Sequence, residues 1–246
     1  MELTESGNFI PGFHSVRDSL AHGKARIKEI WIAEGKAPDR VREILDLADQ
    51  RRIPVLTKDR SFLSRLMPNT SHQGIVALVE KFSYSHLDRL IDISPDQKTL
   101  LIALDHITDE GNLGAIIRTA AFFGVHGLII PKDRSALVSA NVLKRSSGAH
   151  VHLPIARVVN LGASLDLLKK KGCWIVGASG EGKESLYEFD WKRDVVLVLG
   201  NEQKGLSPSV RKRCDIEVRI PGSGRVESLN VAVASGVILS EIIRQR

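Results

Sequence analysis

Short, wholly apolar segments that alternate with helical patterns constrain the fold of this chain more than any other feature. They lie in the second half, at 99–105 (TLLIALD), 126–131 (HGLIIP), 173–178 (CWIVGA) and 194–200 (DVVLVLG). Strands that are apolar on both faces and alternate with helices form parallel sheets covered on both sides, so the pattern predicts an α/β fold. Ligands of such sheets bind at the C-terminal ends of the strands, so the loops after these segments should carry the chemistry.

The first 80 residues show a separate alternation of helical and strand patterns, which predicts a smaller α/β unit. Residues 81–98 are more polar and contain Pro95, as expected of a connector. We therefore predict an N-terminal domain over 1–80, a linker over 81–98 and a larger domain over 99–246.

Composition narrows the classes of protein that fit. The net charge of +6 is compatible with a nucleic-acid partner. The only cysteines, Cys173 and Cys214, lie far apart, which excludes a disulfide framework or a cysteine-based metal site and fits a reducing cytoplasm. The histidines are scattered, so no metal is expected. The N-terminus lacks the pattern of a signal peptide, and no apolar run approaches the ~18 residues of a membrane span.

Residues 177–184 (GASGEGKE) come close to a nucleotide-binding P-loop. Glycines stand at the right spacing and Lys183 is in place, but Glu184 occupies the position that needs Ser or Thr. The residues that follow have little helical periodicity, although a P-loop runs directly into a helix. The segment also fails the G-x-G-x-x-G pattern, and G-x-S-x-G is absent from the chain. These departures argue against an NTPase, a dinucleotide-binding protein and an α/β-hydrolase.

The loop after the first apolar strand leads into a helix over 112–124. Asn112 falls where the N-cap of that helix is expected, and Gly111, Gly114 and Arg118 share one helical face. An arginine beside glycines can approach a phosphate or carboxylate closely; the alternative is an ordinary solvated arginine. Three apolar residues should form the buried side of this helix: Ile116, Ile117 and Ala120.

Two further strand-end loops carry glycine and polar residues. Residues 197–208 place Gly200, Glu202 and Gly205 between a strand and a helix, although a simple turn would need glycine as well. In residues 220–246, Ser228 is the expected cap of the C-terminal helix, whose N-terminus favours an electron-rich oxygen. Ala232, Ser235 and Gly236 make a strip on that helix where another backbone, such as that of a second subunit, can pack. The alternative is a normally capped amphipathic helix.

The three loops, in this order, resemble the three motifs of the SpoU family of RNA ribose 2′-O-methyltransferases (the TrmH/RlmB group), and the chain is closest to the RlmB-like branch. The motifs read NLGAIIRTA at 112–120, LGNEQKG at 199–205 and IPGSGRVESLNVAVA at 220–234. PGFHSVRDSL at 11–20, HQGIVALVE at 72–80 and IPKDRSA at 130–136 extend the resemblance over essentially the whole chain.

The resemblance implies a SPOUT fold, in which the C-terminal segment is threaded into a deep trefoil knot, with a small ribosomal-protein-like RNA-binding domain before it. It implies a homodimer formed through the C-terminal domain, with S-adenosyl-L-methionine bound in the knot beside the interface. The backbone at Gly200, Ile220 and Leu229 matches the cofactor-binding positions, and the loop at Ala178 and Ser179 should lie near the adenosine. The polar set of the active site matches these residues: Asn112, Arg118, Glu202, Ser228 and Asn230.

The family's motif arginine, here Arg118, has been assigned the role of general base. An arginine with a pKa above ~12 is a poor base at neutral pH. We expect Arg118 instead to anchor the target phosphate and to stabilise the developing alkoxide, while Ser228 and Asn230 position the ribose hydroxyl. The sequence departs from the family at Gly222-Ser223-Gly224, which follow Pro221, and at Glu227, where serine is common.

The expected substrate is a guanosine of large-subunit ribosomal RNA. The alternatives are the same chemistry on tRNA or on another ribosomal RNA nucleotide, or a non-catalytic RNA-binding homologue that keeps the fold.

Overall fold

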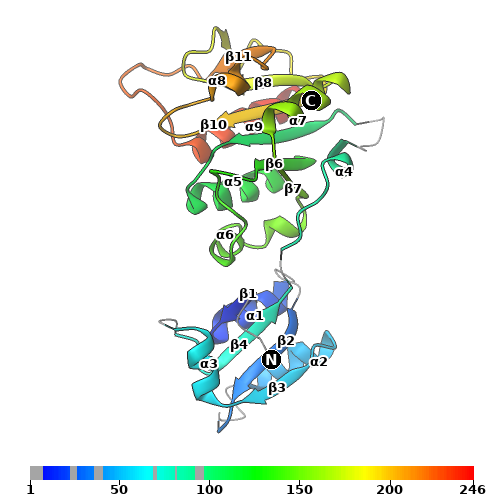
Figure 1. Ribbon diagram of the computed structural model, residues 1–246, viewed down its shortest axis with the longest axis vertical. Coiled ribbons are helices and arrows are strands. Elements are labelled where there is room, and N and C mark those ends of the chain that lie inside the picture. Colours follow the sequence, from blue (N-terminus) through cyan, green and yellow to red (C-terminus); the bar gives the residue numbers. More distant parts are fainter. Residues whose placement is uncertain (1–7, 23–26, 36–40, 69–70, 81, 92–96) are drawn as a thin grey trace. The chain divides into compact units, whose positions relative to one another are not determined.

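The computed structural model describes residues 8–22, 27–35, 41–68, 71–80, 82–91 and 97–246. The chain divides into two compact units, Met1–Ser83 and Tyr84–Arg246 (Figure 1). No helix among the described residues is long and apolar enough to cross a membrane.

The first unit is built on a four-stranded sheet with the order β1-β4-β2-β3. The strands are β1 (Asn8–Pro11), β2 (Ile27–Ala33), β3 (Val55–Lys58) and β4 (Ile75–Val79). β4 runs antiparallel to both neighbours, whereas β2 and β3 are parallel. Because side chains alternate along a strand, Ile30 and Ile32 of β2 face one side of the sheet, and Trp31 and Ala33 face the other.

Helices cover both faces of this sheet. α1 (Phe13–His22) and α2 (Arg42–Gln50) bury Val16, Leu20 and Ile44 on the Ile30 side. α3 (Arg60–Leu66) packs Leu63 against Trp31 on the other side. The first unit is therefore an α/β sandwich with its own core.

The second unit contains a seven-stranded sheet in the order β7-β6-β5-β10-β8-β11-β9, and every pair of neighbouring strands is parallel. The prediction of an α/β fold with a parallel sheet is confirmed. The strands are β5 (Leu100–Asp105), β6 (Gly127–Pro131), β7 (Ile155–Val158), β8 (Trp174–Ala178), β9 (Glu184–Ser185), β10 (Val195–Gly200) and β11 (Ile216–Arg219).

Helices lie on both faces of the larger sheet, as the apolar strands require. α5 (Glu110–Phe122) packs against α6 (Ala140–Arg145) and against α9 (Val231–Gln245), which also contacts β10 (Figure 1). α7 (Leu161–Lys170) and the short α8 (Pro208–Arg211) form the opposite core, with Leu165, Leu168 and Val210 among its buried residues. The predicted buried side of α5 is confirmed, because Ile116, Ile117 and Ala120 are fully buried.

Part of the segment taken as a connector packs on the second unit. Ser85 pairs with Ala156 beside β7, and α4 (Asp88–Ile91) buries Leu90 in the α7-side core. Pro95 lies outside the described residues.

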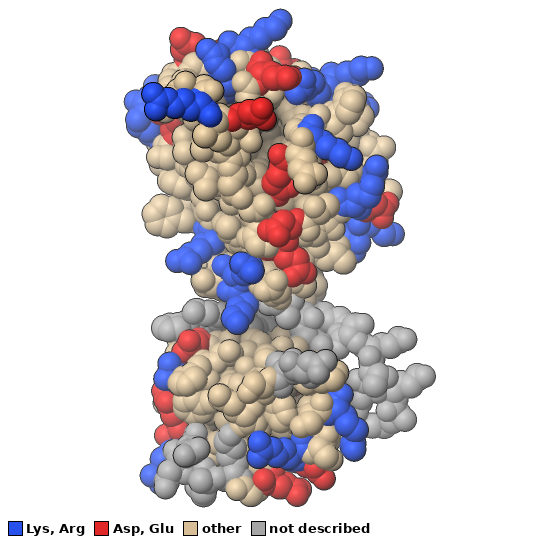
Figure 2. Space-filling view, turned by 90° about the vertical axis from the view of Figure 1, so that its left-hand side faces the viewer, with Lys and Arg blue, Asp and Glu red and all other residues tan. Residues whose placement is uncertain are grey.

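The order of the strands brings two loop-bearing strand ends together. β10 lies between β5 and β8, although it follows both in the sequence, and Gly200 at its end is in register with Asp105 at the end of β5. The face in Figure 2 carries acidic and basic side chains interspersed rather than one uniformly basic surface.

Candidate active site

A chain of side-chain hydrogen bonds joins the three strand-end loops. Asn112 Nδ2 donates to Glu202 Oε1 at 2.7 Å, and Asn230 Nδ2 donates to Asn112 Oδ1 at 2.9 Å. The three residues come from α5, from the loop after β10 and from the position before α9. The structure therefore brings together three of the five polar residues that the sequence singled out, although they are far apart in the chain.

The helix caps differ from the sequence prediction. Asp109, not Asn112, is the N-cap of α5, and its Oδ1 accepts a hydrogen bond from the Asn112 backbone N–H at 2.7 Å. Asp is as good a cap as Asn, and Asp109 lies three residues before Asn112, directly before the first helical residue, Glu110. The predicted cap at Asn112 is wrong, and the Asn112 side chain is free to reach Glu202.

Asn230, not Ser228, caps α9. Its Oδ1 accepts from the backbone N–H groups of Ala232 and Val233 at 2.9 and 3.3 Å. Ser228 lies two residues before the cap, in the exposed stretch 221–230. The prediction that Ser228 begins the helix is wrong, and Asn230 both caps α9 and belongs to the hydrogen-bonded chain.

Arg118 lies on the side of α5 that faces α6. Its Nη1 donates to Ser147 Oγ at 3.4 Å, and among the hydrogen bonds of the described residues none joins it to the Asn112 chain. A Cβ on Gly114 would lie 2.6 Å from the Cβ of Arg145. Gly114 is therefore needed for close packing of α5 on α6, while Arg118 remains exposed to an incoming ligand.

The geometry of the turn after β10 is enough to explain why it contains glycines. Asn201 and Gly205 exchange two backbone hydrogen bonds of 3.0 and 2.9 Å, and Gly205 has a φ of 62°. A Cβ on Gly200 would lie 2.4 Å from the carbonyl carbon of Gly205. The tight turn needs both glycines whether or not a ligand approaches, and it carries Glu202 toward Asn112.

The remaining predicted cofactor residues lie near the ends of adjacent strands. Ala178 at the end of β8 is in register with Leu199 of β10 and with Val218 of β11, shortly before Ile220. A Cβ on Gly180 would lie 3.7 Å from the carbonyl oxygen of Glu227, so the loop after β8 lies beside the third motif. Ile220 is half-buried and Leu229 is half-exposed.

The P-loop-like segment has no P-loop geometry. Glu184 and Ser185 form the short strand β9, which pairs with β11, where a P-loop would continue into a helix. The Ser179 hydroxyl accepts from Glu181 N at 3.2 Å, and the Arg211 guanidinium lies 3.5 Å from it. Lys183 is exposed. The rejection of an NTPase is supported.

Sequence reasoning missed a polar group beneath this site. Asp105 is 1% exposed, and its two carboxylate oxygens contact His106 Nδ1 and Ser207 N, both at 2.6 Å. The His106 carbonyl accepts from Asn201 Nδ2 at 2.9 Å. An aspartate that closes an otherwise apolar strand was the signal in the sequence.

The burial of Cys173 and Cys214 argues against a catalytic role for either thiol. Burial raises the pKa of Cys173 to about 11 and that of Cys214 to about 12. Both stay protonated at neutral pH, and a protonated thiol is a poor nucleophile.

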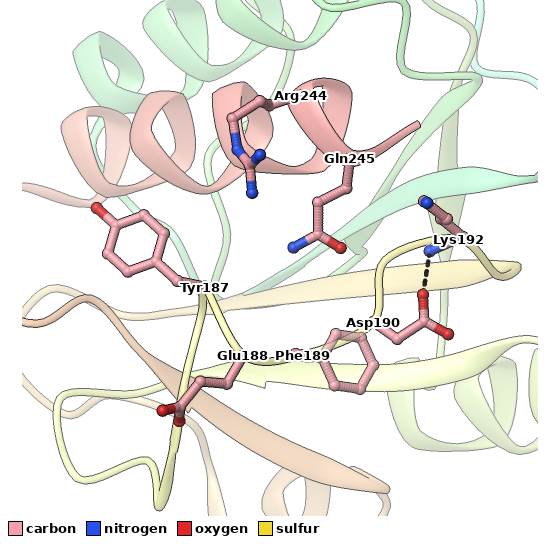
Figure 3. Close-up of a pocket in the computed structure, with 7 residues that line it drawn as sticks. All are labelled: Tyr187, Glu188, Phe189, Asp190, Lys192, Arg244 and Gln245. Carbon is pink, nitrogen blue, oxygen red and sulfur yellow. Dashed lines mark hydrogen bonds between the residues drawn. The ribbon is translucent and has the colours of Figure 1, made fainter.

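A separate pocket of about 460 Å³ lies between the segment after β9 and the end of α9 (Figure 3). Its lining shares no residue with the hydrogen-bonded chain: Tyr187, Glu188, Phe189, Asp190, Lys192, Arg244 and Gln245. Arg244 and Gln245 both donate to Glu241, and Asp190 accepts from Lys192 N and from Arg193. Arg244, Gln245 and Asp190 are thus already hydrogen-bonded within the protein, and we assign the pocket no ligand.

Comparison with known proteins gives matches over both units. Residues 99–240 match the model of the SpoU rRNA Methylase family, and residues 9–85 match the model described as RNA 2′-O ribose methyltransferase substrate binding. The 23S rRNA (guanosine-2′-O-)-methyltransferase RlmB of Pseudomonas aeruginosa is 43% identical over 96% of this chain and 95% of that protein. The protein of the same name from Ralstonia nicotianae is 39% identical over 96% and 94%.

Solved structures agree over the same length. The SpoU methyltransferase AviRb from Streptomyces viridochromogenes, in complex with the cofactor AdoMet, has a TM-score of 0.75 at 30% identity and covers 96% of this chain and 89% of its own. An AdoMet-bound rRNA methyltransferase from Sinorhizobium meliloti has a TM-score of 0.74 at 30% identity, with coverage of 97% and 87%.

Proposed function

Because the chain belongs to the SpoU rRNA methylase family, we propose that it transfers a methyl group from S-adenosyl-L-methionine to a ribose 2′-oxygen of RNA. The substrate is a guanosine of large-subunit ribosomal RNA, as the names of its full-length relatives indicate. The observation that carries the proposal is the chain Asn230–Asn112–Glu202, which joins all three motifs at one edge of the sheet.

The residues around the adjacent ends of β8, β10 and β11 fit the cofactor. Backbone groups at Gly200, Ile220 and Leu229, together with Ala178 and Ser179, offer N–H and C=O partners to a neutral adenine and ribose. The register of these strands and the position of Gly180 close to the Glu227 carbonyl oxygen support one common site. When bound, S-adenosyl-L-methionine supplies an electrophilic methyl group.

The polar side chains of the site act on the RNA. An amide nitrogen carries two N–H bonds and a carboxylate has two oxygens, so each member of the chain keeps capacity after its hydrogen bond is made. Glu202 fixes Asn112, and Asn112 fixes Asn230, whose second N–H can donate to the ribose oxygen. Ser228, in the exposed stretch before the cap, adds a hydroxyl that can position the same 2′-OH.

Arg118 provides positive charge rather than a base. Its exposed guanidinium can hold the phosphate of the target nucleotide and stabilise the oxygen as it loses its proton. The 3.4 Å contact with Ser147 is long and weak, so the guanidinium is easily drawn to a stronger anionic partner.

We further propose that the C-terminal segment is threaded into a trefoil knot and that two chains form a dimer through this domain. The position of β10 between β5 and β8, and the return of the chain through 221–230 to α9 beside α5, support the knot. Exposed apolar side chains on α5, on α9 and just before it support a dimer: Phe122, Leu229 and Val233. Sedimentation equilibrium tests the dimer, and a concentration-independent monomer mass would contradict it.

The N-terminal unit is proposed to bind RNA with a ribosomal-protein-like fold, and the protein to work in the cytoplasm. Support comes from the match of residues 9–85 to a substrate-binding model and from exposed arginines such as Arg60 and Arg65.

Calorimetry with S-adenosyl-L-methionine, followed by a methyl-transfer assay on ribosomal RNA and tRNA transcripts, tests the proposed function. We expect cofactor binding and transfer to large-subunit ribosomal RNA. Transfer to tRNA alone would favour the tRNA alternative, whereas absence of cofactor binding would favour a non-catalytic RNA-binding homologue.

A further inference from the structure

The buried carboxylate at the end of β5 supports the site from below. We infer that Asp105 and Asn201 are positioning residues, which hold the turn 201–205 so that the Glu202 carboxylate reaches Asn112. The inference rests on the proposed function, because it assigns a role within that site.

The buried Asp105 carboxylate contacts residues of two loops. Its Oδ2 accepts the Ser207 backbone N–H at 2.6 Å, and its Oδ1 lies 2.6 Å from His106 Nδ1. Hydrogen bonds to an ionised carboxylate are short and strong, and burial strengthens them further. His106 has a φ of 60°, in the left-handed region that non-glycine residues rarely adopt. The carboxylate thus holds a strained backbone and the start of α8 in fixed places.

Asn201 completes the connection on the other side. Its Nδ2 donates to the His106 carbonyl at 2.9 Å, and its Oδ1 accepts from Gln203 N and Lys204 N at 3.0 and 3.2 Å. One side chain therefore both shapes the turn and attaches it to the loop after β5.

Glu202 is the residue next to this attachment, on a turn that is otherwise exposed. Its 2.7 Å contact with Asn112 spans two loops, so it depends on how those loops are held relative to each other. A displacement of about 1 Å at a reacting group can cost about 100-fold in rate. Asp105 and Asn201 hold the two loops in this relative position, although neither residue belongs to the hydrogen-bonded chain Asn230–Asn112–Glu202.

Substitutions can separate the two functions of the Asn201 side chain, which shapes the turn 201–205 and attaches it to the loop after β5. Asn201→Asp keeps the oxygen that accepts from Gln203 and Lys204 but replaces the donor to the His106 carbonyl by a second oxygen. Asn160→Asp is the matched control, because Asn160 caps α7 through its Oδ1, a role that Asp fills equally well.

Steady-state methyl transfer to RNA, with kcat and KM measured separately, is the first test. We expect Asn201→Asp to lower kcat about tenfold and to leave KM for RNA within about threefold, with Asn160→Asp unchanged. In a Glu202→Ala background the same substitution should lower the rate by less than about twofold further, because Asn201 acts through Glu202. An unchanged kcat, or an equal tenfold loss in both backgrounds, would overturn the inference.

Two substitutions of Asp105, of which only one can keep its hydrogen bonds, test its positioning role. Asp105→Asn can keep both contacts, since its oxygen accepts from Ser207 N and its amide donates to the other tautomer of His106. We expect Asp105→Asn to retain kcat within about threefold and Asp105→Ala to lose at least tenfold. Equal losses in the two variants would show that hydrogen bonding at this position is not what matters.

Amide hydrogen exchange tests the geometry without reference to activity. The Ser207 N–H should exchange about tenfold faster in Asp105→Ala than in the wild type, and at the wild-type rate in Asn160→Asp. If the wild-type chain methylates no RNA, the proposed function fails while this measurement still decides whether Asp105 holds the loop. An unchanged Ser207 rate in a folded Asp105→Ala variant would refute the positioning role itself.

Discussion

Asn230 has two roles in one side chain, and substitutions can separate them. Asn230→Ser keeps an oxygen that can cap α9 but removes the donor to Asn112, whereas Asn230→Ala removes both. We expect kcat to fall about 100-fold in each variant, by analogy with loss of one donor at a reacting oxygen. Only Asn230→Ala should also lose about 1 kcal/mol of stability, measured by denaturant unfolding. A Ser variant with wild-type kcat would remove Asn230 from the mechanism.

Arg118 distinguishes electrostatic stabilisation from general-base catalysis. In an Arg118→Lys variant we expect a lower rate with an unchanged profile of rate against pH, because the charge remains and no proton is transferred to the side chain. If the limiting pKa of the profile instead follows the new lysine, Arg118 is the base and its assignment as an anchor is wrong.

Substitution of Lys183 tests whether the loop after β8 binds a phosphate. The side chain is exposed and the segment runs into a strand, so no phosphate is expected there. Lys183→Ala should leave the affinity for S-adenosyl-L-methionine within about threefold by calorimetry. A tenfold loss, about 1.4 kcal/mol, would restore a phosphate-binding reading of the segment.

At the scale of elements, glycines in helices serve packing. A Cβ on Gly114 of α5 would lie 2.6 Å from the Arg145 Cβ and 3.2 Å from the Val142 carbonyl oxygen, so Gly114→Ala should cost about 1–3 kcal/mol. Gly236→Ala in α9, compared with Gly114→Ala on the monomer, is the control, because its nearest neighbour within the chain, Thr119 Cγ2, is 3.7 Å away. There the better helix propensity of alanine should leave stability equal or slightly higher. Equal destabilisation of the two variants would contradict the packing account.

The elements were largely predictable because their patterns are local. Apolar runs predicted four strands of the larger sheet, β5, β6, β8 and β10, but not β7 or β9. The periodicity of 112–124 predicted the buried side of α5. Caps were less predictable, since Asp109 and Asn230 compete with nearby Asn112 and Ser228, and the outcome depends on where each loop ends. The place of β10 between β5 and β8 arises from tertiary packing, which no local pattern records.

Candidate site residues could be named from the sequence, but the hydrogen bonds between them could not. The motif resemblance singled out Asn112, Glu202 and Asn230, and their mutual contacts appeared only in the folded chain. The roles of Asp105 and Asn201 were not predicted. A single aspartate at the end of a strand, such as Asp105, has many ordinary explanations. Burial with two 2.6 Å contacts is what distinguishes Asp105.

For the whole molecule, we propose that the first unit binds RNA and that the second carries out the chemistry. We expect Arg60→Ala combined with Arg65→Ala in the first unit to raise KM for RNA several-fold and to leave kcat unchanged. Removing phosphate contacts should also make the dependence of binding on salt less steep. A lower kcat with unchanged KM would place these arginines outside RNA binding, and filter binding at several salt concentrations provides the measurement.

Mapping ribose 2′-O-methylation across ribosomal RNA and tRNA, in cells that lack this protein, decides whether the chain methylates ribosomal RNA. We expect one guanosine of large-subunit ribosomal RNA to lose its 2′-O-methyl group. The wild-type protein should restore the modification, and the Asn230→Ser variant should not. If no nucleotide of either RNA changes, or if the variant restores methylation fully, the proposed function and the site assigned to it are contradicted.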